Sequence, residues 1–244
     1  MPELPDVTRR ITAHLSTADP VLARVIAAHG PCTLRADRSI SPFQHLAHAI
    51  AHQQLNGTAA RTIFGRFVAL YGADGSFPSP HEVLATPIES VRAAGFSGSK
   101  VAALRDLAQK TIDGVVPQLE TLLTLDDAAI IERLTAVRGI GPWTVQMMLM
   151  FQLGRPDVLP VDDFGVRQGF QLAYGLRKMP TPRALHAYGV RWAPYRSAAA
   201  WYLWRAVDLH REQKLPEPLR PAPRLRPASR RRRVRKPAAA RARK

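Results

Sequence analysis

The chain has 244 residues, of which 46% are hydrophobic, and a formal net charge of +16 at pH 7. It contains no run of 18 apolar residues, and its first residues lack the apolar core of a signal peptide, so neither a transmembrane span nor a secretory leader is predicted. The single cysteine, Cys32, is typical of a reducing compartment and excludes a four-cysteine iron–sulfur cluster.

The charge is concentrated at the C-terminal end. Residues 215–244 contain 12 Lys and Arg against one Glu, so they carry +11 of the total. Prolines and arginines dominate there, and the apolar residues are too few to bury a core. We therefore predict a folded body over residues 1–214 and a disordered basic tail over residues 215–244 that seeks polyanions.

The N-terminal part is predicted to be helical. Apolar periodicity indicates helices over residues 7–15 and 19–28. A third helix starts at Ser41 and Pro42, an N-cap followed by a first-turn proline, and ends near residues 55–57.

Three histidines lie on one face of that third helix. His45, His48 and His52 have a spacing that could hold a metal ion. No cysteine and no H-E-x-x-H pattern accompanies them. We interpret them as part of a polar helix face and predict no metal site.

Three further helices follow. One covers residues 58–71, and a capping box over residues 86–89 opens a second that runs to Ala94. The third covers residues 101–112, and Lys100 precedes it in a first turn where the helix dipole disfavours a cation. We expect Lys100 either to face a phosphate or to be solvated.

The most informative stretch follows a periodic run that ends at Val137. Arg138-Gly139-Ile140-Gly141 breaks that run, and a second helix restarts with Pro142 at its first position. Two helices joined by a Gly-x-Gly turn form a helix–hairpin–helix. Its glycines let the backbone approach a phosphate, and the second helix offers free N–H groups, so the motif predicts a clamp for a nucleic-acid backbone.

A pair of carboxylates comes about 20 residues later. After a turn at residues 154–156 and a short apolar segment, Asp162 and Asp163 precede a helix that runs from Phe164 to about Leu172. A carboxylate at a helix N-terminus is held ionised by the dipole and by the free N–H groups. An isolated Asp-Asp pair at such a place is more often a helix cap than a catalytic group.

The combination G-I-G-P-W-T, then P-V-D-D, resembles the helix–hairpin–helix (Gly/Pro-rich, Asp) superfamily of base-excision DNA glycosylases, in particular its 3-methyladenine DNA glycosylase II branch. The resemblance implies that Asp163 is the catalytic aspartate and that Asp162 supports the helix start. It places Trp143 where lyase-active relatives carry a Schiff-base lysine, which implies hydrolysis without backbone cleavage.

The same resemblance extends to both sides of the hairpin. It places the wedge that enters the duplex at Gln54, with Leu55 as the adjacent candidate, and turns Gln53 toward the base pocket. An ordinary polar helix end is the alternative for this segment. The motif R-W-x-P-[aromatic]-R-S and the helix after it place the pocket tryptophan at Trp204; the alternative is that Trp201, Tyr202 and Trp204 are all core residues.

The remaining site residues complete this hypothesis. Trp143, Phe164 and Trp204 would stack on the extruded base, and Met147 occupies a pocket position where the branch can have an aromatic. The backbone contacts would come from Arg138, Gly139, Gly141 and Lys100. Whether a monovalent cation binds the hairpin carbonyls stays open; no other cofactor is implied.

The predicted fold is all-α, with about ten helices in two lobes and a helix–hairpin–helix. One lobe would run from residue 43 to about 126, and the other would gather the hairpin helices with the N- and C-terminal helices. Too few residues precede the helices for the β-rich domain that some relatives carry. We expect a cytoplasmic, nucleoid-associated monomer that excises N-alkylated purines from double-stranded DNA, with no membrane partner. The alternatives are a glycosylase for oxidised, deaminated or mismatched bases, and a non-catalytic DNA-binding protein.

Overall fold

The structure is a computed structural model that describes residues 6–72 and 76–219. These residues form thirteen α-helices, a π-helical turn (η1) and a 3-10 turn (η2), with no strand among them. The all-α prediction is confirmed. More helices form than expected, mainly because α5 and α8 have six residues each, too few to show a hydrophobic period.

The helices are α1 (Asp6–Ala18), α2 (Pro20–His29), α3 (Pro42–His52), α4 (Gly57–Val68), α5 (Pro80–Ala85), α6 (Ile88–Ala93), α7 (Gly98–Ile112), α8 (Leu119–Thr124), α9 (Asp127–Leu134), α10 (Pro142–Met148), η1 (Leu149–Leu153), α11 (Phe164–Ala173), α12 (Pro182–Gly189), η2 (Val190–Trp192) and α13 (Arg196–Arg211).

Side-chain caps set where many of these helices begin. Asp19 caps α2 and Ser41 caps α3, each by accepting from backbone N–H groups of the first turn, and both helices continue with a proline. Asn56, Asp126 and Thr181 cap α4, α9 and α12 in the same way. These starts follow from residue type alone, which is why several could be predicted.

The predicted capping box at Thr86 is wrong. The box lies one helix earlier, where Ser79 and Glu82 cap α5 reciprocally. Thr86 instead ends α5, and its hydroxyl donates to Glu82 O at 2.7 Å, so it cannot serve the next helix. α6 begins at Ile88, and its N-cap Pro87 provides no side-chain cap.

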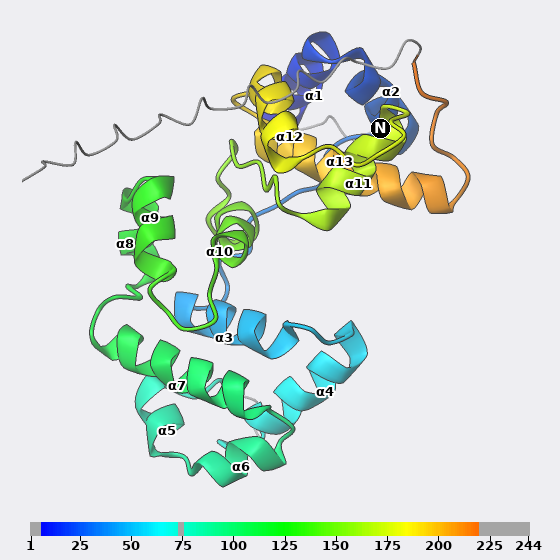
Figure 1. The fold of residues 1–244 in the computed structure, drawn as a ribbon. Helices are drawn as coiled ribbons and strands as arrows, with labels where there is room; N and C mark the ends of the chain where they lie inside the picture. The colour runs from blue at the N-terminus through cyan, green and yellow to red at the C-terminus, as the bar shows by residue number, and fades with distance from the viewer. Residues whose placement is uncertain (1–5, 73–75, 220–244) are drawn as a thin grey trace, which may run out of the picture.

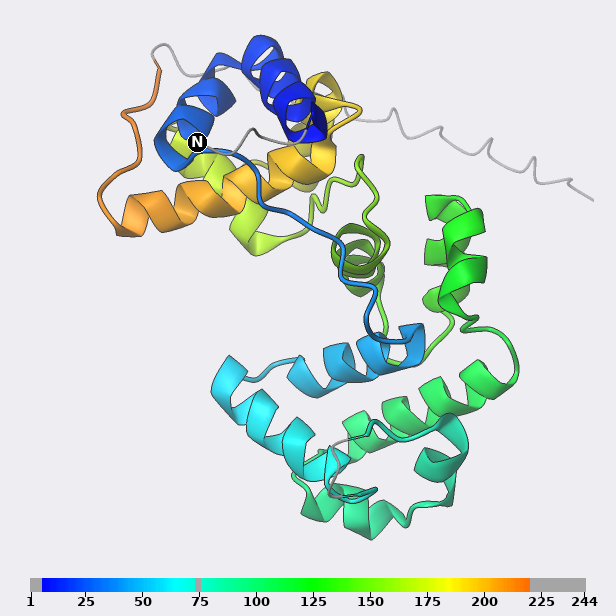
Figure 2. The same cartoon turned by 180° about the vertical axis from the view of Figure 1, so that it is seen from behind.

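Two groups of helices form the ends of the molecule (Figure 1). α1, α2, α11, α12 and α13 pack at one end, with α11 against α13 as their most extensive contact. α3 to α7 pack at the other end, mainly through α7 against α3 and α5. The segment between α2 and α3 connects the groups along one side of the molecule (Figure 2).

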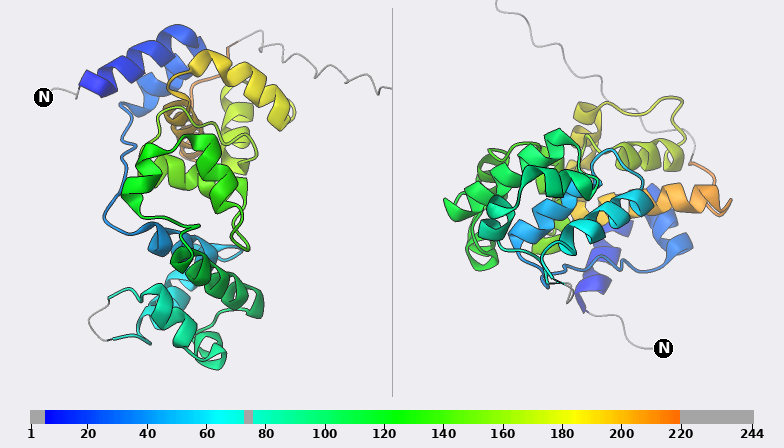
Figure 3. Two further views of the ribbon diagram at one scale, coloured as in Figure 1. Left: turned by 90° about the vertical axis from the view of Figure 1, so that its left-hand side faces the viewer. Right: turned by 90° about the horizontal axis from the view of Figure 1, so that it is seen from below.

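The hairpin helices do not join the N- and C-terminal helices as expected. α10 packs mainly on α9, η1 and α3, and lies between the two groups, with α8 and α9 beside it (Figures 1 and 3). Arg155 fastens this part, because its guanidinium donates to Leu125 O at 2.6 Å and pairs with Asp127 at 3.2 Å. The hairpin is therefore held between the lobes rather than inside one of them.

A buried carboxylate ties α2 to the C-terminal helices. Asp19 is fully buried, and its Oδ2 accepts from Tyr174 Oη at 2.5 Å and from Trp192 Nε1 at 2.9 Å. Burial and then the Asp19 charge raise the pKa of Tyr174 well above its ordinary value, so the phenol stays a donor. Trp192 belongs to the R-W-x-P motif, and this contact gives that motif a structural role.

The first residues of the predicted tail lie against the body. Glu217 O accepts from Arg24 Nη1 at 2.6 Å, and Leu215 packs against the core. The remainder of the predicted tail, residues 220–244, lies outside the described residues. No helix within residues 6–72 and 76–219 is long and apolar enough to cross a membrane.

Candidate active site

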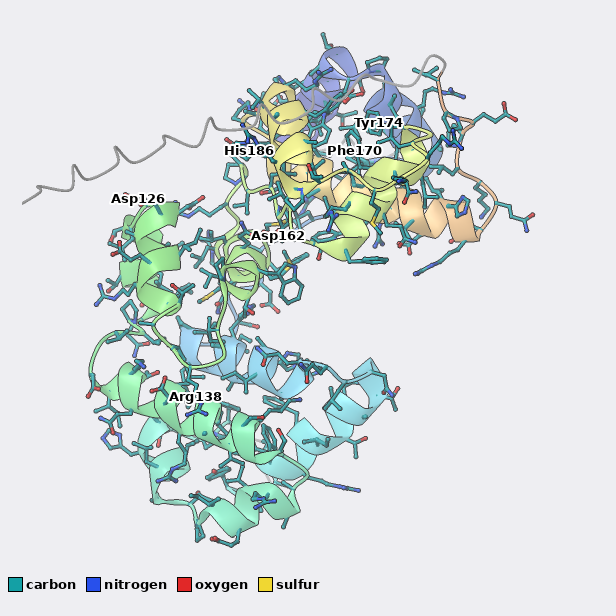
Figure 4. All side chains as sticks on the ribbon, in the orientation of Figure 1. Asp126, Arg138, Asp162, Phe170, Tyr174 and His186 are labelled. Atoms are coloured by element: carbon teal, nitrogen blue, oxygen red, sulfur yellow. The ribbon has the colours of Figure 1, made fainter. Side chains whose placement is uncertain are left out.

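Asp163 is the N-cap of α11. Its Oδ1 accepts from Val166 N at 2.7 Å, while Asp162 is exposed on the preceding loop. The helix start was expected to be supported by Asp162, and that expectation is wrong, because the second aspartate of the pair makes the capping contact. Figure 4 shows Asp162 where the chain passes from α10 to α11, between the two helix groups.

Two indole N–H groups converge on the same carboxylate. Trp143 Nε1 donates to Asp163 Oδ2 at 2.9 Å, and Trp204 Nε1 donates to Asp163 Oδ1 at 2.8 Å. The structure thus brings together three residues predicted for the site, from α10, the start of α11 and α13. Both carboxylate oxygens accept a hydrogen bond, so the carboxyl group is held from two sides.

Small residues and helix starts make this approach possible. Trp143 is the second residue of α10, directly after Pro142, so the hairpin turn determines where the indole begins. A Cβ on Gly165 would lie 2.8 Å from Trp204 Cδ1, so only glycine leaves room for that ring over the first turn of α11. On the core side, α11 and α13 meet closely at Gly169.

Two exposed aromatic side chains belong to the site, Trp143 in contact with the carboxylate and Phe164 next to Asp163 in the chain. Trp143 is 46% exposed and Phe164 is 62% exposed, so both rings are accessible to a bound partner. Trp204 is partly buried and Met147 is partly buried against the core. Trp204 therefore combines the two alternatives, since it packs on the core while its N–H reaches Asp163.

Sequence reasoning missed Phe151. Its ring stacks on Trp204 with centroids 5.8 Å apart and an interplanar angle of 23°. Phe151 lies in the π-helical turn η1, which advances the helix face by less per residue than an α-helix does. The only available signal was the apolar run around it, which reads as continuous core.

The hairpin presents backbone between α9 and α10. Gly139 has φ +78°, in the left-handed region that favours glycine, and Gly141 is the N-cap of α10. Arg138 is exposed, and its backbone N–H donates to Asp106 Oδ2 at 2.7 Å, which fixes the turn on α7 (Figure 4). The N–H groups that open α10 have no side-chain cap at Gly141.

The predicted wedge loop follows α3. Gln54 is exposed with φ +57°, and Leu55 is 40% exposed, so both present their side chains to solvent. A positive φ in a residue other than glycine is a strained conformation that is found preferentially at functional turns. The geometry suits a loop that inserts into a partner, and it does not select between the two residues.

Gln53 and Lys100 lie elsewhere than expected. Gln53 Nε2 donates to Gly139 O at 2.8 Å, so the side chain braces the wedge loop on the hairpin turn instead of entering the base pocket. Lys100 Nζ donates to Ala51 O at 2.7 Å, near the C-terminal end of α3, instead of facing outward. Desolvation there lowers the pKa of Lys100. The end of a helix carries partial negative charge, which explains why a cation is drawn to it.

The histidines of α3 form a stack on the helix surface. The rings of His48 and His52 are 3.8 Å apart, and the ring of Phe64 meets both. Burial lowers the pKa of His45 to about 4, and repulsion from His48 adds to this effect. No group of three or more metal-ligating side chains occurs among residues 6–72 and 76–219.

Known proteins resemble the chain in sequence and in fold. Residues 47–194 match the model of the HhH-GPD superfamily base excision DNA repair proteins. DNA-3-methyladenine glycosylase 1 of Schizosaccharomyces pombe is 40% identical over 199 residues, which cover 80% of this chain and 86% of the relative.

Solved structures agree with these sequence matches. The S. pombe 3-methyladenine DNA glycosylase in complex with abasic DNA superposes with a TM-score of 0.72 at 40% identity, covering 80% of this chain and 95% of that one. A DNA-3-methyladenine glycosidase from Bacillus halodurans superposes with a TM-score of 0.75 at 33% identity, covering 83% and 91%. The chain belongs to the HhH-GPD superfamily of base excision DNA repair proteins.

Proposed function

We propose that this protein is a monofunctional DNA glycosylase that extrudes N-alkylated purines of the 3-methyladenine type from double-stranded DNA and hydrolyses their glycosidic bond. The observation that carries the proposal is Asp163, a helix-capping carboxylate held by two indole N–H groups among exposed aromatic rings. The named activity of the S. pombe and B. halodurans relatives supports the same substrate class.

Binding comes first, because a base inside a duplex cannot be reached. The backbone at Gly139 and Gly141 grips a phosphate without reading sequence. Gln54 or Leu55 enters the duplex and fills the space of the expelled base, at an unstacking cost of a few kcal/mol that is lower for damaged bases. Because Gln53 donates a hydrogen bond to Gly139 O, the hairpin that holds the phosphate and the loop that enters the duplex are linked and move together.

Chemistry follows at Asp163. An N-alkylated purine such as 3-methyladenine is cationic, so it leaves readily and needs little general-acid help. The carboxylate stabilises positive charge on the sugar as the C1′–N bond breaks. Because the carboxylate is already oriented before the reaction, it does not have to reorient as that charge develops. The faces of Trp204, Phe164 and Phe151 meet the cationic base, a contact that contributes about 0.5–2 kcal/mol.

The residue at position 143 makes the enzyme a hydrolase. Trp143 stands where lyase-active relatives carry their lysine, and an indole cannot form a Schiff base. Water therefore attacks the sugar and the DNA backbone stays intact. The reaction needs no cofactor, since the substrate supplies the good leaving group.

A monovalent cation at the hairpin is compatible with the geometry, because Gly139 O keeps a second lone pair beside the Gln53 contact. The proposal also places the enzyme in the cytoplasm as a monomer associated with nucleoid DNA.

A base-release assay tests the proposal. Duplexes that carry 3-methyladenine, 7-methylguanine, hypoxanthine, 8-oxoguanine or a mismatch are incubated with the protein, and both free base and strand cleavage are measured. We expect release of alkylated purines without strand cleavage. Release of oxidised or mismatched bases alone would favour the alternative specificity, and binding without release from any duplex would overturn the enzymatic proposal.

A further inference from the structure

We propose that Trp143 and Trp204 act as positioning residues that fix the plane of the Asp163 carboxylate, so that Trp143 serves the reaction through its N–H group. This inference rests on the proposed function. Three donors reach the carboxylate: Val166 N and Trp204 Nε1 on Oδ1, and Trp143 Nε1 on Oδ2. A carboxylate held through one oxygen can turn about its Cβ–Cγ bond, whereas one held through both cannot.

An ordinary helix cap in the same chain shows what capping alone requires. Asp126 caps α9 by accepting from Ala129 N at 2.8 Å through Oδ1, and this is the one side-chain hydrogen bond that caps α9. Asp163 has the equivalent contact from Val166 N at 2.7 Å. The two indole contacts are additional to the cap, so helix formation does not explain them.

Burial does not explain them either. At Asp19 an indole N–H and a phenol satisfy a fully buried carboxylate, as the cost of burying an unpaired charge demands. Asp163 is only partly buried and Trp143 is 46% exposed, so water could satisfy Oδ2. A specific donor at a site that water can reach indicates that the direction of the carboxylate matters.

Trp204 is held by its neighbours, and Trp143 is tied to the hairpin by its position in the chain. Trp204 lies between Gly165, where a Cβ would be 2.8 Å from its Cδ1, and the stacked ring of Phe151. Trp143 is the second residue of α10, directly after the hairpin, so its Cα belongs to the backbone that would grip DNA. The carboxylate is thereby aligned with both the base pocket and the phosphate clamp. Because the donors are in place before charge develops on the sugar, no reorganisation is needed during the reaction.

Trp-to-Phe substitutions isolate the N–H groups, because phenylalanine keeps an aromatic face and removes the donor. We expect Trp143→Phe to lower the single-turnover rate of base release by about tenfold or more, the effect of losing a hydrogen bond to a charged group. Trp204→Phe should lose less, since Val166 N still holds Oδ1. Affinity for DNA that contains an abasic site should stay near that of the wild type.

Trp201→Phe is the matched control. Trp201 is buried in α13 beside Tyr202 and outside the site, so this variant reports the general cost of replacing a tryptophan in the C-terminal helices. Its base-release rate should equal that of the wild type. An unchanged rate in Trp143→Phe would overturn the positioning role. A loss of rate matched by an equal loss of DNA affinity would also overturn it, because the indole would then serve binding.

The indole N–H signals of the full chain give a second readout that is independent of activity. The chain has four tryptophans, and their NMR signals can be assigned with the single Trp-to-Phe variants. Asp163→Asn should shift the signals of Trp143 and Trp204 and leave that of Trp192, which donates to Asp19, unchanged. If neither signal moves, the two indole hydrogen bonds to Asp163 do not exist in solution. If the signals move but the wild type releases no base, the two indole hydrogen bonds are real and the proposed function is what fails.

Discussion

Gly169→Ala tests the packing that brings the site together. Gly169 lies in the middle of α11 and faces the backbone of α13, where an added Cβ would overlap the carbonyl oxygen of Leu203 and lie 2.6 Å from its carbonyl carbon. Carbon atoms in favourable contact are about 3.5–4.0 Å apart, and the carbonyl oxygen of Leu203 lies closer to the added Cβ than its carbon does, so the helices must separate by more than about 1 Å. The obstacle is backbone, which cannot turn aside as a side chain can.

Gly169→Ala should lower the free energy of unfolding by about 3 kcal/mol, the upper end of the range that overpacking produces. The opposite sign is expected at Gly65, a helical glycine of α4 where an added Cβ would meet nothing within 4 Å. Gly65→Ala should raise the free energy of unfolding by about 0.5–1 kcal/mol. The two variants make the same chemical change in the same chain. Only the space beside the glycine differs between them.

Urea and thermal unfolding of both variants measure this difference. For a body of this size a loss of 3 kcal/mol corresponds to a fall in Tm of about 6–12 °C. The Gly169 variant should also release base slowly, because its shift separates Asp163 from Trp204. If Gly169→Ala were as stable as Gly65→Ala, the close approach of α11 and α13 would be wrong.

Asp163→Asn should lower base release by at least about a hundredfold while abasic-DNA affinity stays within about tenfold. Asp162→Asn should stay near wild type, and reversed behaviour of the pair would move the catalytic assignment by one residue. Folding lowers the pKa of His45 from 6.5 to about 4, so between these pH values the unfolded chain binds more protons than the folded chain. The free energy of unfolding should therefore fall by up to about 3 kcal/mol as the pH drops from 6.5 to 4. Urea unfolding of His45→Gln should lack this loss, and an equal pH slope in both proteins would contradict it. Lys100→Met should slow base release by loosening the wedge loop and leave the salt dependence of DNA binding unchanged. If Lys100 contacted a phosphate instead, the slope of log affinity against log salt concentration would fall by about one.

Local chemistry allowed much of the fold to be predicted. Ser41 with Pro42, Asp19 with Pro20, and the glycines of the hairpin have conformational requirements that few other structures satisfy. The capping box shows the limit of such reasoning. Residues 79–82 and 86–89 both fit the pattern, and only the first forms the box, because the second begins where the preceding helix ends.

The arrangement of the site depended on contacts that no local pattern contains. Trp143 and Trp204 are 61 positions apart in sequence, and neither was expected to donate a hydrogen bond to Asp163. Their N–H contacts with Asp163 follow from how α10 and α13 approach α11, which periodicity does not determine. Lys100 illustrates the same limit, since its place in the first turn of α7 led to the expectation of a phosphate contact or of solvent, and not of the Ala51 carbonyl that the amine binds.

The basic C-terminal segment makes the strongest electrostatic prediction. Residues 220–244 contain 12 Lys and Arg and no Asp or Glu, so their deletion removes most of the +16 charge. The deletion should start after Leu219, because Glu217 and Leu215 contact the body. Each neutralised phosphate contributes close to one unit of salt slope, so if about four to six of these charges touch DNA the slope should fall by that number.

Affinity for undamaged duplex, measured from low to high salt with and without residues 220–244, gives the slope. Single-turnover base release at saturating enzyme gives the chemistry, which should barely change because Asp163, the hairpin and the wedge loop all precede the deletion. An unchanged slope would mean that the segment does not contact DNA in the complex. A collapsed single-turnover rate would mean that it contributes to the catalytic body, and the boundary after Leu219 would then be wrong.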